Sequence, residues 1–481
     1  MIASLFVQPY VLFWQGAFIK LLALTYFLAF FSLYVQLPAL YGSNGIQPAH
    51  VLLDWVRKRA KNYYLICPTL FWVSSSDRSL KIGALIGMAA ALLVIVGAPA
   101  APLLVVLWAI YLSFKTIGSE FLSFQWDILL LEMGFIAIFF AIQWPPPPLF
   151  VYLLWFLLFH FMLSSGLMKF VWGSSEWRDL TAMRYHYETQ PIPNRLAYYM
   201  HQLPDFLGKL TVVAVFVWEI ILPFFIFSPS WVRIGVFALL VLLQLLIVLT
   251  GNFAFFNILT VVLCIPLLMD VNPGVFYESF ASQPAVQTNM YLNGFLSLIA
   301  AVLLIMNMAE LALNGIRYQP FAKVLSRITM SKYLAPYAIV NWYGLFSHMT
   351  TKRYEIVIEG SLDDVVWSAY EFRWKPGDLA RAPPQVAPHQ PRLDWQMWFA
   401  ALRGYQQQSW LTNVMIRLLE GSPEVTALFQ TNPFANAPPK FIRCKLYLYH
   451  FSDLKIKKST GYWWTRQFVG MFSPTFSLNK S

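Results

Sequence analysis

Charged residues are scarce in this sequence: Lys, Arg, Asp and Glu make up 12% of its 481 residues, where soluble proteins carry about 25%. The scarcity is uneven, because 31 of the first 349 residues are charged, against 26 of the last 132. Hydrophobic residues reach 58%. These figures exclude an ordinary soluble protein and a disordered chain, and they predict a long membrane part followed by one water-soluble domain.

Cysteine is also scarce. The three cysteines, Cys67, Cys264 and Cys444, form neither a CxxC pair nor the ligand spacing of a zinc site. The sequence has no HExxH, no glycine-rich phosphate loop and no GxSxG. We therefore expect no metal and no cofactor, and no disulfide framework can be argued.

The net charge of +11 is not accompanied by a basic stripe with interleaved aromatic residues, so a nucleic-acid partner is not expected. Basic residues that flank apolar segments instead contact the anionic headgroups of a bilayer. The lipid bilayer is therefore the first partner that the sequence predicts.

Nine apolar segments are long enough to cross a hydrocarbon core of about 30 Å. They are residues 13–37, 82–98, 101–118, 121–143, 149–171, 211–228, 231–250, 253–269 and 291–313. The predicted fold class is an all-α polytopic helix bundle of about nine spans, residues 1–320, with polar loops at 38–81 and 172–210. An amphipathic connector at 321–349 leads to a soluble domain at 350–481.

The soluble domain is predicted to be α+β and rich in strands. Residues 354–360 alternate with period two, and residues 365–374 are β-branched and aromatic, so the two segments are expected to pair as a hairpin. Residues 392–403 and 409–421 have helical patterns. Residues 441–451 alternate again and predict a further strand.

Two carboxylates, Asp127 and Glu132, lie in the fourth apolar segment. Charge inside a bilayer is costly, so such residues mark either a functional site or a buried pair. For Asp127 we expect a partner from another span or from the 172–210 loop, with Arg178 and Arg184 as the nearest candidates by residue type. A packing role and a chemical role both remain open.

The 172–210 loop holds the densest polar cluster beside the membrane, and its candidate functional residues are Trp177, Arg178, Asp179, His186, Glu188 and Gln190. His186 has the residue type of a general acid or base, and with Glu188 it could contribute to a metal site. No second pair with metal spacing accompanies them. The alternative is a buried, hydrogen-bonded loop that caps the bundle.

Four segments resemble the lipase maturation factor family. The loop segment contains Trp-Arg-Asp-Leu-Thr at 177–181 and Tyr-His-Tyr-Glu-Thr-Gln-Pro-Ile-Pro-Asn at 185–194. Residues 121–132, which begin Phe-Leu-Ser-Phe-Gln-Trp-Asp, are similar to its intramembrane motif. Residues 386–402, with Pro-His-Gln-Pro-Arg-Leu-Asp-Trp, are similar to its C-terminal motif, and residues 41–48 to its first loop. We call these the motif segments.

This resemblance implies a multi-pass membrane protein that helps secreted lipases, or other exported proteins, to reach their assembled active state. It implies the endoplasmic reticulum membrane for a eukaryotic source and the inner membrane for a bacterial one. A distant similarity of the family to vitamin K-dependent carboxylases leaves a membrane-embedded enzyme as the alternative, with no catalytic residue assigned. A transporter would show paired halves with interrupted helices, and none are visible.

Orientation is left open by the sequence. Nine spans place loop 38–81, loop 172–210 and the soluble domain on one side of the membrane, and Cys67 and Cys444 would report this. The basic residues of both loops favour the cytosol for that side. The resemblance implies the lumen, and long loops often cross the membrane regardless of their charge.

Client recognition is expected in the soluble domain, because lipid-facing residues of a bundle cannot meet a secreted protein. Trp395, Trp398 and Phe399 are three and four residues apart and share one face of the predicted helix, with His389 and Arg392 at its rim. This face is either part of the domain core or the client-binding surface. If it is core, recognition is expected in the 172–210 loop.

Overall fold

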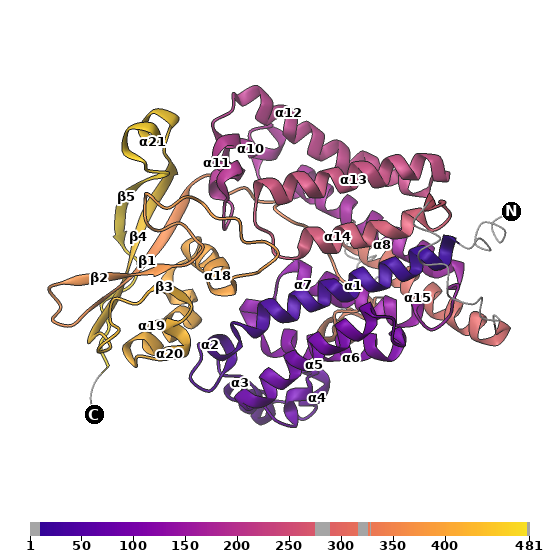
Figure 1. The fold of residues 1–481 in the computed structure, drawn as a ribbon, viewed down its shortest axis with the longest axis horizontal. Helices are drawn as coiled ribbons and strands as arrows, with labels where there is room; N and C mark the ends of the chain where they lie inside the picture. The colour runs from indigo at the N-terminus through magenta and orange to yellow at the C-terminus, as the bar shows by residue number, and fades with distance from the viewer. Residues whose placement is uncertain (1–9, 275–288, 316–325, 328, 479–481) are drawn as a thin grey trace.

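The computed structural model describes residues 10–274, 289–315, 326–327 and 329–478. Figure 1 shows a helical bundle at one end of the molecule and a sheet at the other, arranged along the long axis. The predicted fold class, a helical membrane part followed by an α+β domain, is confirmed.

Seven helices of the described residues are long and apolar enough to cross a membrane. They are α1 (Tyr10–Tyr34), α5 (Asp77–Ile95), α6 (Ala100–Ile117), α8 (Pro148–Leu167) with its π-helical end η4 (Met168–Trp172), α12 (Asp205–Phe216) extended by η5 (Val217–Ile221) and η6 (Leu222–Phe227), α13 (Ser230–Thr250) and α15 (Met290–Gly315).

Two of the nine predicted spans are shorter helices, so the count of nine is not confirmed. Helix α7 (Gln125–Phe140) has 16 residues, or about 24 Å at 1.5 Å per residue. The residues before it form the 3-10 helix η3 (Ser119–Leu122). Helix α14 (Phe256–Cys264) gives way to the 3-10 helix η7 (Ile265–Leu268), which contains Pro266. Hydropathy registers the apolar residues in both segments but not these changes of helix type.

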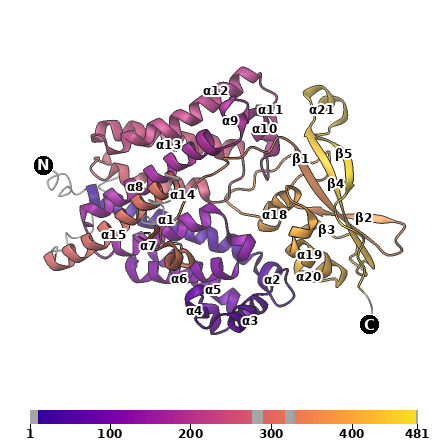
Figure 2. The ribbon, with the colours of Figure 1, turned by 180° about the vertical axis from the view of Figure 1, so that it is seen from behind.

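The soluble domain is built on one antiparallel sheet with the order β3-β2-β1-β4-β5. Its strands are β1 (Arg353–Ser361), β2 (Trp367–Phe372), β3 (Phe429–Thr431), β4 (Phe441–Phe451) and β5 (Trp464–Met471). Strands β1 and β2 form the predicted hairpin, with Ile358 opposite Tyr370. Figure 2 shows α18 (Arg392–Ala401), α19 (Ser409–Leu419) and α20 (Pro423–Thr426) between the sheet and the bundle. The 3-10 helix η10 (Tyr405–Gln407) precedes α19, and α21 (Leu454–Thr460) joins β4 to β5.

Both polar loops fold into short helices. Loop 38–81 contains α2 (Leu37–Tyr41), α3 (Ala49–Arg59), α4 (Tyr63–Ile66) and η2 (Leu70–Trp72), and loop 172–210 contains α9 (Ser175–Arg178), α10 (Ala182–Thr189) and α11 (Arg195–His201). Each loop makes hydrogen bonds to the soluble domain. The loops and the domain therefore lie at the same end of the bundle, as the sequence predicts.

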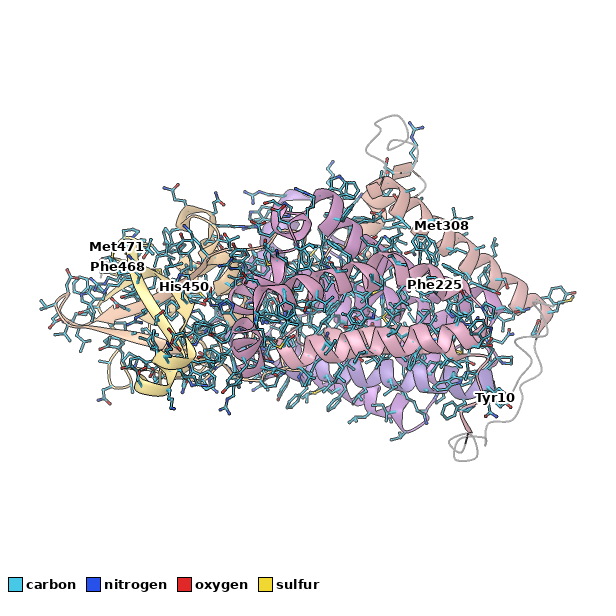
Figure 3. All side chains as sticks on the ribbon, turned by 90° about the horizontal axis from the view of Figure 1, so that it is seen from above. Tyr10, Phe225, Met308, His450, Phe468 and Met471 are labelled. Carbon is cyan, nitrogen blue, oxygen red and sulfur yellow. The ribbon has the colours of Figure 1, made fainter. Side chains whose placement is uncertain are left out.

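The connector predicted at 321–349 lies partly outside the described residues. Helices α17 (Ser331–Leu334) and η9 (Ala335–Tyr337) come next, and Tyr343 is completely buried in the bundle. Tyr343, in the range expected to be a connector, therefore belongs to the bundle core. Figure 3 shows the bundle, with Tyr10, Phe225 and Met308 labelled, and the sheet domain, with His450 labelled, at opposite ends.

The side of the membrane can be tested with introduced cysteines, because all three native cysteines are buried. We expect Val73→Cys, in the first polar loop, and Val365→Cys, in the β1–β2 turn, to react equally with a membrane-impermeant maleimide, since both side chains are exposed. Sealed vesicles of known orientation should label both or neither. Labelling of one position alone would contradict the shared side.

Candidate functional site

The bundle and the soluble domain are joined by a buried ion pair. Asp127 of α7 and Arg392 of α18 are both 0% exposed. The guanidinium donates to the two carboxylate oxygens at 3.1 and 3.2 Å, and the Tyr111 hydroxyl donates to Asp127 at 2.6 Å. Arg392 also donates to the carbonyl of Phe121. The expected partners Arg178 and Arg184 are not the ones used, because the partner comes from the soluble domain, 265 residues away.

The segment that leads into α18 is fixed by polar side chains of α1. Ser32 Oγ accepts from the Gln390 backbone N–H and lies 2.9 Å from His389 Nδ1. Gln36 donates to the carbonyl of Gln390 at 2.8 Å and accepts from the Arg392 N–H at 2.9 Å. The backbone groups of Gln390 and Arg392 therefore form their hydrogen bonds with side chains of the first transmembrane helix, in place of the backbone partners that a helix or sheet would supply.

The predicted aromatic face packs against the bundle. The ring of Trp395 lies 5.1 Å from that of Trp126 and 5.6 Å from that of Phe124, and Phe399 lies 6.0 Å from Phe124. The indole N–H of Trp398 donates to the carbonyl of Thr189 at 2.7 Å. Trp395 and Arg392 are fully enclosed. A client could reach these two side chains only after the domain left the bundle.

Arg353 of β1 holds the 186–194 loop. Its guanidinium donates to the backbone carbonyls of Glu188, Gln190 and Pro191 at 2.5–2.9 Å. Glu355 lies 2.6 Å from the same guanidinium and 2.7 Å from the ammonium of Lys375. A buried arginine thus has a charged partner and three acceptors, which is the condition for tolerating it in an interior.

Glu188 and Gln190 complete this contact. The Glu188 carboxylate accepts from the Phe451 N–H at 2.6 Å and lies 3.3 Å from His450 Nδ1. The Gln190 amide donates to the carbonyl of Thr250 at 2.8 Å. Both side chains therefore hold the loop against its neighbours, which agrees with the alternative of a hydrogen-bonded cap.

Asn252 and Asn194 are contact residues that were not among the candidate functional residues, although Asn194 ends a motif segment. The Asn252 side chain donates to the carbonyl of Pro384 and accepts from the N–H groups of Val386 and Ala387. Asn194 donates to the side chain of Gln385 at 2.7 Å. The Thr-Gly-Asn sequence at 250–252 separates two apolar segments, and this was the only signal for Asn252.

The first motif segment also touches the soluble domain. The carbonyls of Asn44, Gly45 and Ile46 accept from Ser422, Arg417 and Asn413. All four motif segments thus contribute to one contact between bundle and domain, which we call the junction.

The remaining predicted residues lie outside these contacts. Glu132 accepts from the Tyr343 hydroxyl at 2.6 Å and from the Asn341 amide at 2.8 Å, inside the bundle. Trp177 is buried and donates to the carbonyl of Phe346. Arg178 donates to the carbonyl of Gly173, and Asp179 is exposed at the end of α9.

His186 faces a cavity beside the junction. The cavity has a volume of about 330 Å³, and Phe161, Lys169, Glu219 and Phe253 also line it. Burial, together with the charge of Lys169, lowers the pKa of His186 to about 4, so the imidazole is neutral at pH 7. In the described part of the chain no three His, Cys, Asp or Glu side chains cluster in a way that could hold a metal ion.

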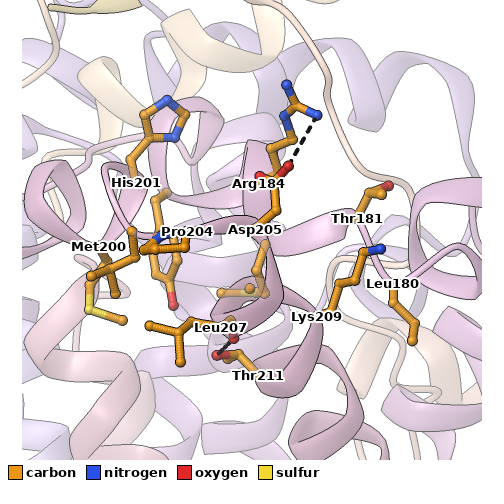
Figure 4. Close-up of a pocket in the computed structure, with 14 residues that line it drawn as sticks. Leu180, Thr181, Arg184, Met200, His201, Pro204, Asp205, Leu207, Lys209 and Thr211 are labelled. Carbon is orange, nitrogen blue, oxygen red and sulfur yellow. Dashed lines mark hydrogen bonds and ion pairs between the residues drawn. The ribbon is translucent and has the colours of Figure 1, made fainter. Parts of the chain in front are cut away.

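A second, smaller hollow lies in the 172–210 loop. Figure 4 shows Arg184 paired with Asp205, and Thr211 bonded to the Leu207 carbonyl, at its edge. Its volume of about 60 Å³ equals roughly two water molecules at ~30 Å³ each. It is too small for the acyl chain of a lipid.

Comparison with known proteins gives consistent matches along the chain. The profile described as lipase maturation factor transmembrane domain matches residues 13–274, and the one described as lipase maturation factor C-terminal domain matches residues 339–474. Together they include all of the motif segments.

Individual relatives cover nearly the whole chain. Lipase maturation factor 2 of Gallus gallus is 33% identical over 577 residues, which covers 96% of this chain and 81% of the relative. Lipase maturation factor 2 of Homo sapiens is 33% identical, with 98% and 83% covered. Lipase maturation factor 1 of Mus musculus is 32% identical, with 96% and 86% covered. No solved structure matches. The chain belongs to the lipase maturation factor family.

Proposed function

We propose that this protein is a multi-pass membrane maturation factor that helps secreted lipases reach their active state. The observation that carries the proposal is the junction. The segments that resemble the family motifs use their polar side chains to fix a sheet domain onto a membrane bundle. An assembly of this kind presents a rigid surface next to the membrane, where newly translocated clients emerge.

The carboxylates of the bundle support a binding role rather than a catalytic one. Asp127 is held by Arg392 and Tyr111, and Glu132 by Tyr343 and Asn341. Both groups are fully enclosed. A general acid or base must reach the group with which it exchanges a proton, and these side chains face only their structural partners. An enzyme built on them is therefore not our proposal.

The client surface that we propose is the free edge of β5. This strand pairs with β4 on one side and is the last strand of the sheet. Within the described residues no backbone hydrogen bond joins the other edge of residues 465–470. Phe468, Val469 and Met471 are 52%, 50% and 51% exposed, and Figure 3 shows Phe468 and Met471 on the side of the sheet domain that faces away from the bundle.

An incompletely folded client exposes chain segments that can bind to a free strand edge. Extended segments of a client expose unpaired backbone groups and apolar side chains, and they can add to an open sheet edge as a further strand. Backbone pairing tolerates many sequences, which suits a factor that meets more than one lipase. Side chains on the two faces of β5 would then add apolar contact.

The residues first expected at the client surface receive a different proposed role. His389, Arg392, Trp395, Trp398 and Phe399 face the bundle or the 186–194 loop. We propose that they attach the domain. In the 172–210 loop, Leu196 and Tyr199 of α11 and Phe206 at the start of the membrane helix α12 are exposed, and the place of Phe206 fits interfacial anchoring.

We place the protein in the endoplasmic reticulum membrane for a eukaryotic source, with the sheet domain in the lumen. Secreted lipases fold in that compartment, so a client surface in the cytosol could not meet them. The buried cysteines agree with a domain whose stability does not depend on the redox state of its surroundings.

The test is complementation in cells that lack their own lipase maturation factors. The readout is the enzymatic activity of a secreted lipase divided by its secreted mass. We expect the wild-type chain to restore this ratio of activity to mass. With the double variant Phe468→Thr and Val469→Thr the restored ratio should be roughly tenfold lower, because a loss of about 1.4 kcal/mol in the free energy of client binding reduces affinity tenfold. Threonine keeps the strand propensity at both positions.

The matched control is Val365→Thr with Val366→Thr, which removes exposed apolar surface from the β1–β2 turn of the same domain. It should leave the restored activity unchanged. Equal losses in the two double variants, at equal abundance, would contradict the β5 edge. A wild-type chain that restores no lipase activity at all would contradict the proposed function itself.

A further inference from the structure

The cavity beside His186 has the size and the apolar lining of a ligand-binding site. Its volume of about 330 Å³ lies between α8, α10, α12 and α13, and Phe161, Val215, Leu243 and Phe253 are among its walls. Ligand sites in proteins begin near ~300 Å³ and are mostly apolar with a few convergent polar groups. This cavity has both properties.

The acidic and basic side chains that line the cavity are one neutral ring and one neutralised pair, and Ser165, Thr211, Gln244 and Thr250 add uncharged polar groups. Among the described residues, neither nitrogen of His186 hydrogen-bonds to protein; the ring is held by Phe253 and Phe346, with centroids at 6.3 and 5.6 Å. Its low pKa keeps one N–H and one lone pair available. Lys169 and Glu219 meet at 2.6 Å, so their charges are already satisfied by each other.

These groups select an uncharged polar head. A carboxylate or phosphate entering the cavity would have to displace Glu219 from Lys169 and would find no other cation among the lining residues. A hydroxyl or carbonyl would instead take the free nitrogen of His186, which costs no charge separation. The chemistry of the cavity therefore favours a neutral head over an anionic one.

The cavity also reaches the lipid-facing side of the bundle. Helices α12 and α13 have only 17% and 28% of their apolar windows buried, so most of their surface faces the bilayer. Leu246 of α13 lines the cavity and is 42% exposed. A hydrophobic molecule dissolved in the membrane can therefore approach the cavity between helices without crossing water.

The size of the cavity limits the ligand to one chain. Its volume of about 330 Å³ equals roughly ten water molecules at ~30 Å³ each, and a methylene group needs a similar volume, so the cavity encloses a head group and the first carbons of one chain. We propose that this cavity binds a neutral, single-chain membrane lipid whose hydroxyl or carbonyl head meets His186. A medium-chain monoacylglycerol is the form of this chemistry that we would test.

The experiment uses the full-length protein in dodecyl maltoside and a decanoyl monoacylglycerol that carries a diazirine in its chain. Val215→Trp places an indole in the cavity, whereas Val213→Trp makes the same change two residues away, on the outer face of α12, where Val213 is 42% exposed and lines no part of the cavity. We expect equal photolabelling of wild type and Val213→Trp, and a loss of roughly tenfold in Val215→Trp, the effect of ~1.4 kcal/mol. Equal labelling of both variants would overturn the proposal.

The preference of the cavity for a neutral head group is tested by competition against the same probe at pH 7. Decan-1-ol should displace the probe at a lower concentration than sodium decanoate, and His186→Phe should remove this preference while keeping the aromatic contacts. Better displacement by decanoate would overturn the neutral head. If Val215→Trp does not elute as a single species, the labelled peptides of wild type decide: label must lie on the segments that line the cavity, residues 161–187, 200, 211–256 or 345–346, and label elsewhere overturns the site.

Discussion

Replacing Asp127 with leucine is expected to remove most of the protein from the membrane. The change leaves the Arg392 guanidinium enclosed without its carboxylate, and breaking one side of a buried pair costs about 3–5 kcal/mol. That is a large share of the ~5–15 kcal/mol that stabilises a folded protein. The measurement is the steady-state amount of tagged protein in the membrane fraction, together with its thermal unfolding in detergent.

The double variant Asp127→Leu with Arg392→Met separates a packing role from a chemical one. Two apolar residues of similar size should recover much of the abundance, because a buried pair can often be exchanged for apolar packing. Arg184→Met is the control: its pair with Asp205 is exposed and 3.8 Å long, so we expect less than ~1 kcal/mol. Normal abundance of Asp127→Leu with lost lipase maturation would contradict the structural role.

Arg353→Met is expected to release the soluble domain from the 186–194 loop. The guanidinium donates to three backbone carbonyls and faces Glu355, and hydrogen bonds to charged groups contribute about 1.5–3 kcal/mol each. The three carbonyls would stay enclosed without a donor. We expect a loss of stability of more than ~4 kcal/mol, seen as faster proteolysis between the bundle and the sheet.

Arg353→Lys should rescue little of this loss, because an ammonium group lacks the planar fork that reaches several carbonyls at once. Arg443→Met is the matched control on the neighbouring strand β4. Its ion pair with Glu359 is partly exposed, so its loss should cost less than ~1 kcal/mol. Proteolysis of Arg353→Met at the wild-type rate would mean that this arginine does not hold the junction.

The elements that follow local rules could be predicted from the sequence. The β1–β2 hairpin follows from the alternation of residues 354–360 and the turn that comes after them. The long spans follow from apolar runs. The short helix α7 could not be separated from a span in this way, because its first turn is lost to a 3-10 helix while its composition stays apolar.

The partners of the buried charges could not be predicted, since they are set by tertiary structure. Asp127 meets an arginine 265 residues away, and Glu132 meets Tyr343 from a segment expected to be a connector. Arg178 and Arg184 were the expected partners of Asp127 because of their residue type and their place in a loop beside the membrane. It identified the side chains that need partners, and the resemblance marked the segments that carry them, but neither indicated that these segments meet.

From the sequence, the aromatic face of α18 could be either part of the domain core or a client-binding surface. In the structure it is neither of these alone, because it packs against the bundle. Trp395 packs on Phe124 and Trp126 of the bundle, so the partner of the face is another part of the chain. A helical pattern shows which side chains share a face, but it does not show whether the surface opposite is protein, lipid or a client.

The most direct test of this account is site-specific photocrosslinking to a lipase during its maturation. A benzophenone amino acid at Val469, on the free edge of β5, is predicted to form an adduct with the newly made lipase. The same amino acid at Phe399, in the junction, is predicted to crosslink only within the chain at equal abundance. Lipase adducts at Phe399 and none at Val469 would contradict the account, because the domain would then have to leave the bundle in order to bind its client.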